Sequence, residues 1–202
     1  MKIRIYVEGG GEQKIGKEKV RQGFGQFFQK ALGESSTSIR VIACGGRSAT
    51  FRDFKNGVDA HPDEFVILLV DSEARVVDGD TVWTHLKKRD PSWEKPLSTT
   101  EDQFHLMVQT MEAWLIADLQ ALQNFYKQHF NENPIPKNSN VEDIEKARLE
   151  PALQNASKNT TKGVYHKINH GPQLLGMIDP QRVQKASRHC KRLLDKLIEI
   201  LQ

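Results

Sequence analysis

The stretch Phe65-Val66-Ile67-Leu68-Leu69-Val70-Asp71-Ser72-Glu73 decides the fold class of this chain. Its first six residues are all apolar, so side chains on both faces of a strand would be apolar. Such a run is typical of a central strand in a parallel sheet that helices cover on both faces. Because the run ends at Asp71, we expect acidic side chains at the carboxyl end of this strand.

Three further segments have the pattern of strands: residues 2–8, 38–44 and 104–109. The first alternates between apolar and polar residues and ends at the glycines 9–11, and the second ends at Gly45-Gly46. Helical patterns lie between the strands, over residues 12–32, 48–58 and 80–88. Strands that alternate with helices predict an α/β fold, here a three-layer, Rossmann-like parallel sheet of about four strands. Ligands of such sheets bind at the carboxyl ends of the strands, where the strand order reverses.

The remainder of the chain has helical patterns, over residues 111–126, 141–156, 172–177 and 180–201. A loop with two prolines, residues 131–140, interrupts them. We therefore expect an α/β core over residues 1–130 and a C-terminal helical extension over residues 131–202, packed on the core within a single structural domain.

The composition predicts a cytoplasmic protein without membrane contacts. The chain has 202 residues, two cysteines, and 29 basic against 26 acidic residues, for a net charge of +3. No apolar run approaches the roughly 18 residues that span a bilayer, and Glu8 interrupts the apolar stretch that a signal peptide would need. Two cysteines without metal-site spacing fit a reducing compartment. The net charge is too small to indicate nucleic-acid binding by itself.

Five carboxylates are expected at one edge of the sheet. Glu8 and Asp71 end two strands that are commonly neighbours in such sheets, and Glu73 would point the same way as Asp71 in extended chain. Glu12 and Glu112 lie at expected helix starts. Crowded carboxylates repel one another, and a hard cation such as Mg²⁺ or Mn²⁺ relieves that repulsion. For each residue alone, the alternative is a carboxylate that complements a helix dipole or caps a turn.

Two glycine segments resemble phosphate-binding loops to different degrees. The segment from Gly11 to Lys17 has the spacing of a nucleotide-binding P-loop, but Glu18 replaces the hydroxyl residue that would hold magnesium. A nucleotide-binding loop is therefore not expected here. In Gly45-Gly46-Arg47-Ser48, the backbone amides and Arg47 are candidates for holding a phosphate. An ordinary turn that needs a positive φ is the equal alternative.

A basic stripe at helical spacing is expected on the last helix. It is made of Arg182, Lys185, His189, Arg192 and Lys196. Such a stripe suits a nucleic-acid backbone, although a solvated helix face is the more common explanation. The candidate nucleic-acid contacts in the chain are Arg47, Lys162, Arg182, Lys185 and Arg192.

The acidic strand ends resemble the Toprim domain of topoisomerases, primases and OLD-family nucleases. The resemblance lies in Val7-Glu8-Gly9 and Leu69-Val70-Asp71-Ser72-Glu73. Three more segments make nearly the whole chain similar to the bacterial domain-of-unknown-function family 4276: Cys44-Gly45-Gly46-Arg47, Met111-Glu112-Ala113-Trp114-Leu115-Ile116-Ala117-Asp118 and Tyr165-His166-Lys167-Ile168.

The Toprim resemblance implies magnesium at Glu8, Asp71 and the position of Glu73, with Glu8 also as a general base. The OLD-like nucleases imply further ligands at Glu12 and Glu112. They also use a late lysine near the leaving group, for which Lys162 and Lys167 are candidates. This chain departs from the pattern at Glu73, where the family usually has aspartate; the extra methylene of glutamate reaches further, which would change the metal geometry or leave Glu73 out of contact with the metal.

The function expected from this resemblance is a magnesium-dependent nuclease that hydrolyses nucleic-acid phosphodiesters, with Glu8, Asp71 and Lys167 as catalytic residues. A topoisomerase or primase needs further domains for which the chain has no room. Similar domains work in phage defence or on mobile elements beside ATPase partners. The rival is a non-catalytic Toprim-like binding module in a complex with an ATPase, and DNA and RNA are equal candidates as substrate.

Overall fold

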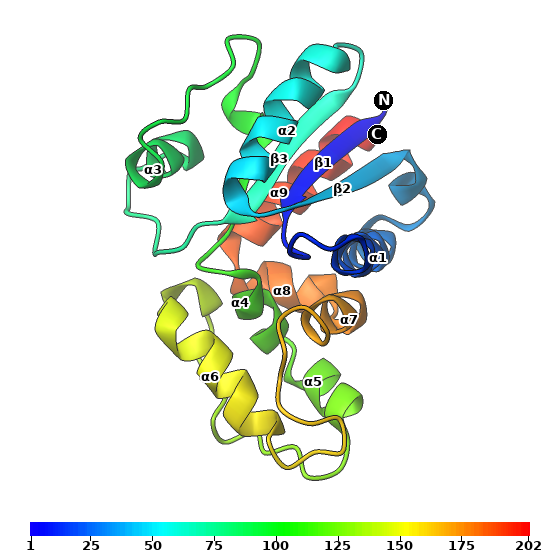
Figure 1. The fold of residues 1–202 in the computed structure, drawn as a ribbon, viewed down its shortest axis with the longest axis vertical. Helices are drawn as coiled ribbons and strands as arrows, with labels where there is room; N and C mark the ends of the chain where they lie inside the picture. The colour runs from blue at the N-terminus through cyan, green and yellow to red at the C-terminus, as the bar shows by residue number, and fades with distance from the viewer.

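The apolar run from Phe65 forms the buried strand β3 (Phe65–Asp71) of a four-stranded parallel sheet. The computed structural model describes all residues 1–202. In it, β3 pairs with β1 (Ile3–Glu8) on one side and with β4 (Phe104–Met107) on the other. Strand β2 (Ile39–Gly45) pairs with the far side of β1. The order β2-β1-β3-β4 means that the chain leaves β1 in one direction for β2 and returns to its other side for β3. The predicted α/β fold is confirmed (Figure 1).

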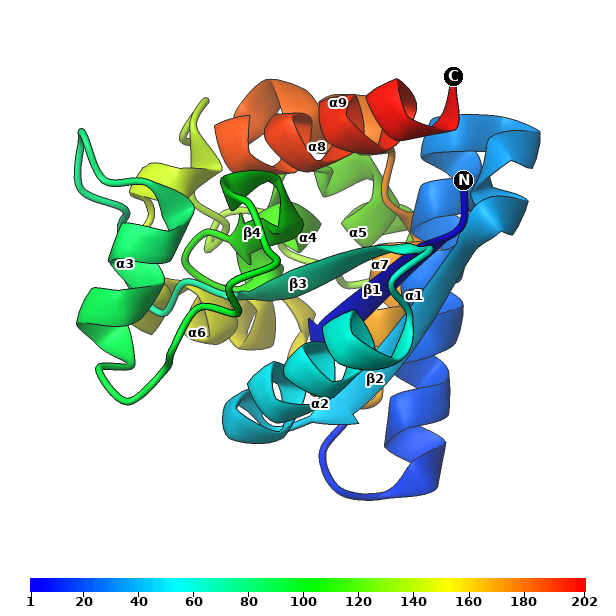
Figure 2. The same ribbon diagram turned by 90° about the horizontal axis from the view of Figure 1, so that it is seen from above.

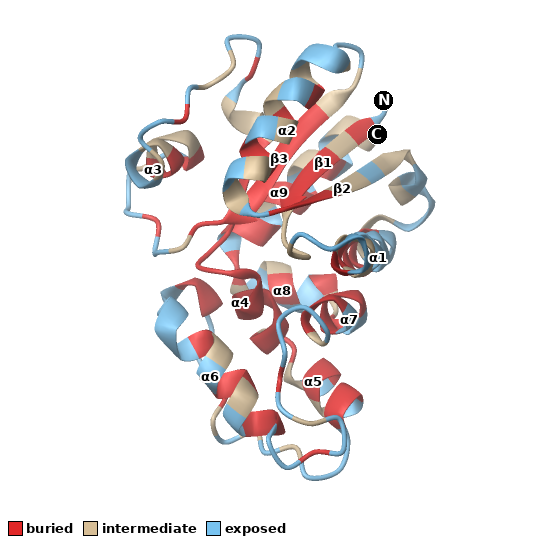
Figure 3. Ribbon diagram, in the orientation of Figure 1, coloured by how far each residue is buried: buried red, intermediate tan, exposed pale blue.

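Helices cover both faces of the sheet. On one face, Tyr6 and Leu68 pack against Phe54 of α2 (Arg47–Ala60), together with α3 (Val82–Arg89). On the other face, Ile5 and Leu69 share a larger cluster with α1 (Lys14–Leu32) and α9 (Arg188–Leu201). Figure 2 shows α2 and α9 on opposite sides of the strands. The apolar residues of β3 are thereby removed from water on both faces, as Figure 3 shows, whereas the edge strand β2 is only partly buried.

A group of helices lies beyond the carboxyl ends of the strands, in the lower half of Figure 1. Its members are α4 (Met111–Ile116), α5 (Leu119–Tyr126), α6 (Lys146–Ser157) and α7 (Gly171–Met177). Short 3₁₀ helices at Gly33–Ser38, Glu101–Gln103 and Val141–Asp143 connect other elements. Because α4 directly follows β4, these helices close the edge of the sheet at which the strands end.

The C-terminal helices pack closely on the α/β core. Helix α7 runs along α1, and α9 packs on β4 and on α8 (Pro180–Ala186). The larger hydrophobic cluster therefore contains residues from both parts of the chain, including Phe24 and Leu193. No helix combines the length and the apolar character needed to cross a membrane.

Two helices that the sequence predicts as continuous are broken, and in each case a side chain caps the second half. Asp118 accepts a hydrogen bond from the Ala121 amide (3.2 Å), so α5 begins separately from α4. Ser187 accepts one from the Cys190 amide (3.1 Å), so α9 begins separately from α8. Capping side chains satisfy the free amides of a new helix start. The predicted helix over residues 141–156 likewise begins only at Lys146, after a 3₁₀ turn.

The glycine loop after β1 packs tightly on the first turns of α1. Gly10 has φ 87°, and a Cβ there would lie 2.7 Å from the Lys17 amide nitrogen. A Cβ on Gly16 would lie 2.0 Å from the Gly10 carbonyl oxygen. Both positions therefore require glycine, because of the positive φ at one and the backbone contact at the other. Because the loop residues are glycines, no side chain of the loop fills the space beside Glu8.

Candidate functional site

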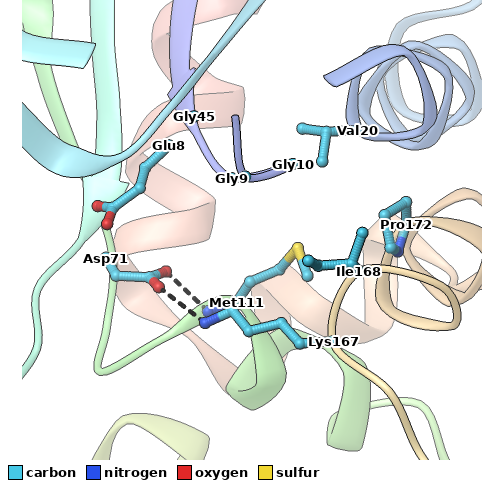
Figure 4. Close-up of a pocket in the computed structure, with 11 residues that line it drawn as sticks. Glu8, Gly9, Gly10, Val20, Gly45, Asp71, Met111, Lys167, Ile168 and Pro172 are labelled. Atoms are coloured by element: carbon cyan, nitrogen blue, oxygen red, sulfur yellow. Dashed lines mark hydrogen bonds and ion pairs between the residues drawn. The ribbon is translucent and has the colours of Figure 1, made fainter. Parts of the chain in front are cut away.

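A cavity of about 230 Å³ opens at the carboxyl ends of β1 and β3. Glu8 ends β1 and Asp71 ends β3, and both side chains line this cavity with Lys167 and the glycines 9–11. Figure 4 shows the two carboxylates next to each other. They meet because β1 and β3 are adjacent, parallel and on either side of the point where the strand order reverses.

Asp71 is the most deeply buried carboxylate of the cavity, with 5% of its surface exposed. Its Oδ1 accepts a hydrogen bond from the Met111 amide (2.9 Å), and its Oδ2 lies 3.6 Å from the Lys167 ammonium. The pKa of Asp71 is raised to about 7: burial is the main cause, Lys167 opposes it, and the neighbouring carboxylates of Glu8 and Glu112 add to it. Asp71 is therefore a group whose charge changes near neutral pH.

Glu8 is held between a buried arginine and the open part of the cavity. One of its oxygens lies 3.4 Å from the Arg47 guanidinium. Burial raises the pKa of Glu8, while Arg47 lowers it. A carboxylate with a raised pKa is a better proton acceptor near neutral pH than an ordinary glutamate.

Arg47, which the sequence offers as a phosphate ligand, is bound to protein groups instead. Two of its nitrogens donate to an Asp90 oxygen (2.9 and 2.8 Å), and one donates to the Asp71 carbonyl oxygen (2.5 Å). Its guanidinium lies 5.1 Å from the centre of the Trp93 ring. Arg47 therefore ties the α2 start to the end of β3. The contacts of Arg47 with Asp90 and Trp93 were not predicted from the sequence. These residues lie far from Arg47 in the chain, and no local pattern links positions so far apart.

Glu112, Tyr165 and Lys167 form a chain of contacts that reaches Asp71. Glu112 is 2% exposed and accepts a hydrogen bond from the Tyr165 hydroxyl (2.9 Å). Its other oxygen lies 3.6 Å from the Lys167 ammonium. Burial alone would lower the pKa of Lys167, but the carboxylates of Asp71, Glu112 and Glu8 raise it above its ordinary value. Lys167 is therefore a permanent cation among three carboxylates. No role for Tyr165 is predictable from the sequence, although the segment Tyr165–Ile168 resembles the domain-of-unknown-function family 4276.

Glu73 and Glu12 do not line the cavity with the other acids. Glu73 has φ 67° rather than an extended backbone, so the expectation that it points with Asp71 was wrong. Its carboxylate is bound to Lys146, and Arg89 lies 3.8 Å away. Glu12 precedes α1 in an exposed bend, with its carboxylate beside Gly45 and Gly46. No three histidine, cysteine or acidic side chains lie close enough together to hold a metal ion as they stand.

The residues nearest the cavity still suit one magnesium or manganese ion. Mg²⁺ is usually held by one or two carboxylates and completes its shell with waters and substrate phosphates. Glu8 and Asp71 offer two such carboxylates on adjacent strand ends, and Glu112 lies beyond Lys167. The ammonium of Lys167 shows that the space between Asp71 and Glu112 accepts a cation. The remaining two predicted ligands, Glu12 and Glu73, would have to move to take part.

The basic residues predicted to contact nucleic acid do not form one stripe. Arg182 and Lys185 lie on α8 and Arg192 on α9, on either side of the break at Ser187. Arg192 donates to the carbonyl oxygens of residues 104 (2.7 Å) and 101 (2.8 Å), and Arg182 lies 3.5 Å from an Asp118 oxygen. Lys185 is exposed.

The other predicted basic residues do not extend a stripe either; these are Lys162, His189 and Lys196. Lys162 is exposed and lies over the Phe125 ring at 4.5 Å. His189 is buried and bonded to Glu142 through its Nδ1 (2.9 Å). Lys196 is paired with Asp102 (2.9 Å). Broken at Ser187 and with several members bonded to protein groups, the expected stripe offers few free cations.

Two backbone amides at the cavity are free to bind a ligand. Gly9 donates its amide to the Gly45 carbonyl oxygen (2.8 Å), but the amides of Gly10 and Gly11 donate to no protein acceptor. Both residues line the cavity. Consecutive amides in a positive-φ turn favour anions, including phosphate oxygens. From the sequence, glycines 9–11 are predicted only as the loop after the first strand, and Gly11 also begins the incomplete P-loop pattern.

One family model matches this chain, and it covers most of its length. The model is described as a domain of unknown function, DUF4276, and it matches residues 7–198. No curated protein and no solved structure matches the chain. The matched range includes every group that lines the acidic half of the cavity.

Proposed function

The chain belongs to the DUF4276 family, and from its acidic cavity we propose that it is a metal-dependent hydrolase of nucleic-acid phosphodiesters. The observation that carries the proposal is the meeting of Glu8 and Asp71 at the carboxyl ends of adjacent parallel strands, in one cavity with Lys167. Paired carboxylates at a strand switch point are a common setting for a hard cation and a phosphorylated ligand. The absence of a nucleophilic serine or cysteine among the lining residues also favours water as the nucleophile.

In this proposal, Glu8 and Asp71 hold Mg²⁺ or Mn²⁺. The ion, when bound, would act as a Lewis acid that lowers the pKa of water and stabilises charge on the phosphate oxygens. Glu8 is either a ligand of the ion or the general base; the second role is supported by its raised pKa in the metal-free protein, which is caused mainly by burial. Lys167 keeps its proton over the whole working pH range and is placed to neutralise charge on a leaving oxygen. The free amides of Gly10 and Gly11 are placed to hold another phosphate oxygen.

The finer assignment follows from the resemblance of the strand ends to the Toprim domain. Val7-Glu8-Gly9 and the acid after Val70 carry the Toprim resemblance, and Glu112 and Lys167 are the candidates for the later acid and lysine of OLD-like nucleases. We extend the proposal to action in phage defence or on a mobile element, beside an ATPase partner, because OLD-like domains work in that setting. The free cations Lys162 and Lys185 are candidates for contacts to the nucleic-acid backbone.

A second candidate is a non-catalytic binding module. The observation that favours it is the position of Lys167, which already neutralises Asp71 and Glu112 without any metal (3.6 Å to each). In a protein that never binds a cation, such a lysine is a sufficient counterion. The two candidates differ in whether Lys167 yields its position to a metal.

The proposal is tested with purified protein, Mn²⁺ and end-labelled single- and double-stranded DNA and RNA. Wild type is expected to cut at least one substrate. Glu8→Gln and Asp71→Asn are expected to lose cleavage about 100-fold or more, because losing even a group that only supports a metal ligand costs about 10–100-fold. Asp195→Asn, an exposed carboxylate on α9, is the matched control. Mn²⁺ should also raise the melting temperature of wild type but not of Glu8→Gln/Asp71→Asn, since it binds only the native site. Cleavage that persists in Asp71→Asn would end the catalytic assignment.

A further inference from the structure

The cavity has two chemically different sides. Glu8, Asp71 and Lys167 form the charged side, whereas Val20, Ile168 and Pro172 form an apolar side contributed by α1, the loop before α7 and α7 itself. Figure 4 shows the apolar side chains across the cavity from the two carboxylates. Met111 joins the sides, since its amide binds Asp71 while its side chain lines the cavity.

The apolar side is open to the solvent at one residue. Val20 is 4% exposed, but Ile168 is 41% exposed at the lining of the cavity. A Cβ on Gly11 would lie 3.7 Å from the Ile168 Cδ1, so the glycine leaves room beside this isoleucine. Ligand pockets are lined mainly by apolar side chains, and Ile168 both lines this cavity and remains accessible to a ligand.

The dimensions of the cavity limit what can reach Asp71. Its volume of about 230 Å³ is below the roughly 300–1,000 Å³ of pockets for drug-sized ligands. Asp71 is 5% exposed, so a phosphodiester must enter the cavity to approach it. A duplex, whose major groove alone is about 12 Å wide, cannot enter. Only a chain end or an unpaired nucleotide is small enough.

We propose that the apolar side of the cavity, at Val20 and Ile168, binds one unpaired nucleobase while its phosphate faces Glu8 and Asp71. This inference rests on the proposed function and names its substrate class as single strands or strand ends. The apolar side chains carry no hydrogen-bond donors or acceptors, so the base is held without being identified. Burial of its apolar surface supplies the affinity.

The first test measures binding without catalysis. Adenosine 5′-monophosphate and ribose 5-phosphate are titrated into the full chain in Mn²⁺ by calorimetry, and the nucleotide is expected to bind about tenfold more tightly. Ile168→Asn should remove most of that preference and leave ribose 5-phosphate unchanged. Val164→Asn is the matched control, because Val164 is 50% exposed in the same loop but does not line the cavity. Equal binding of the two ligands by wild type, or equal losses in the two variants, would overturn the base subsite.

A second test separates this inference from the proposed function. Single-stranded oligonucleotides of each base are expected to be cut at similar rates, and a blunt duplex at least tenfold more slowly. If cleavage needs Asp71 but the duplex is cut as fast as the single strand, the subsite is wrong and the nuclease stands. A different result is that no substrate is cut, although the protein prefers the nucleotide and Ile168→Asn removes that preference. In that case the nuclease proposal is wrong and the nucleobase site stands.

Discussion

Replacing Asp71 with asparagine is expected to stabilise the metal-free protein at pH 8, although it removes a proposed catalytic group. Asp71 has a pKa of about 7 in the folded protein against an ordinary value of 3.8. Between these values the native state holds a proton that the unfolded chain has lost, so stability falls as the pH rises. The destabilisation is complete above pH 7 and absent below the ordinary pKa.

The size of the effect follows from that difference in pKa. Each pKa unit corresponds to 1.36 kcal/mol, so ionisation of Asp71 lowers the free energy of unfolding by about 4 kcal/mol at most. Asparagine resembles the protonated carboxyl and keeps an oxygen for the Met111 amide. Relaxation of the site and the loss of the Lys167 ion pair reduce the benefit, so we expect a gain of about 2 kcal/mol at pH 8. At pH 4 the gain should disappear.

Urea unfolding followed by tryptophan fluorescence from pH 4 to 9, without divalent metal, measures this prediction. The buried Trp114 reports on the core beside α4. Asp195→Asn, at an exposed side chain of α9, serves as the control and should change stability by less than about 0.5 kcal/mol. The reasoning is refuted if Asp71→Asn is no more stable than wild type at pH 8, or if its stability falls between pH 4 and 7 as steeply as that of wild type.

Three further changes test the contacts around the site. Lys167→Met should lower stability by about 1–2 kcal/mol at pH 8. It should also raise the affinity for Mn²⁺ measured by calorimetry, because the ammonium no longer competes with the ion for the carboxylates. Weaker Mn²⁺ binding would contradict this. Arg47→Met should lower the free energy of unfolding in urea by about 3 kcal/mol, because it leaves Asp90 unpaired. Arg52 has a side chain that is 68% exposed, so Arg52→Met should lower it by less than about 0.5 kcal/mol. Glu142→Gln should cost about 2 kcal/mol at pH 7. Although burial raises the pKa of Glu142, the hydrogen bonds from His189 and Ser187 outweigh it and lower that pKa below 4.5, so the cost should shrink as the pH falls below 4.5 toward the lowered pKa. A cost that does not shrink at any pH below 4.5 at which the protein stays folded would count against this.

The sheet was predictable because its signal is local. Six apolar residues before Asp71, and alternation before Glu8, define strands whatever else surrounds them. The breaks at Asp118 and Ser187 were not predicted, because in both segments the apolar spacing continues through the break. The deciding factors are a capping hydrogen bond at each point and, at Ser187, a tertiary partner, since its hydroxyl donates to Glu142 (2.6 Å).

The site was predictable only where strand order controls it. Glu8 and Asp71 meet because they end adjacent strands, a placement that the α/β pattern already indicates. Glu73 does not line the cavity: its backbone turns to positive φ, and Lys146, from a distant helix, binds its carboxylate. The roles of Arg47 and Tyr165 also depend on partners, Asp90 and Glu112, that are more than 40 residues away in the chain. Spacing along the chain carries no information about such contacts.

The two cations of the site differ in how firmly they are held, and this difference decides between the two candidate functions. Arg47 is 13% exposed and is bound by Asp90 and a carbonyl oxygen at hydrogen-bond distance, so it cannot leave Glu8 without breaking those bonds. Lys167 is 45% exposed and lies 3.6 Å from each carboxylate, beyond ordinary hydrogen-bond length. A divalent ion that approaches Glu8 and Asp71 therefore has to displace only the loosely held ammonium, which is then free to meet a phosphate. If Mn²⁺ binding is insensitive to Lys167→Met, no such exchange takes place, and the lysine is the permanent counterion of a binding module.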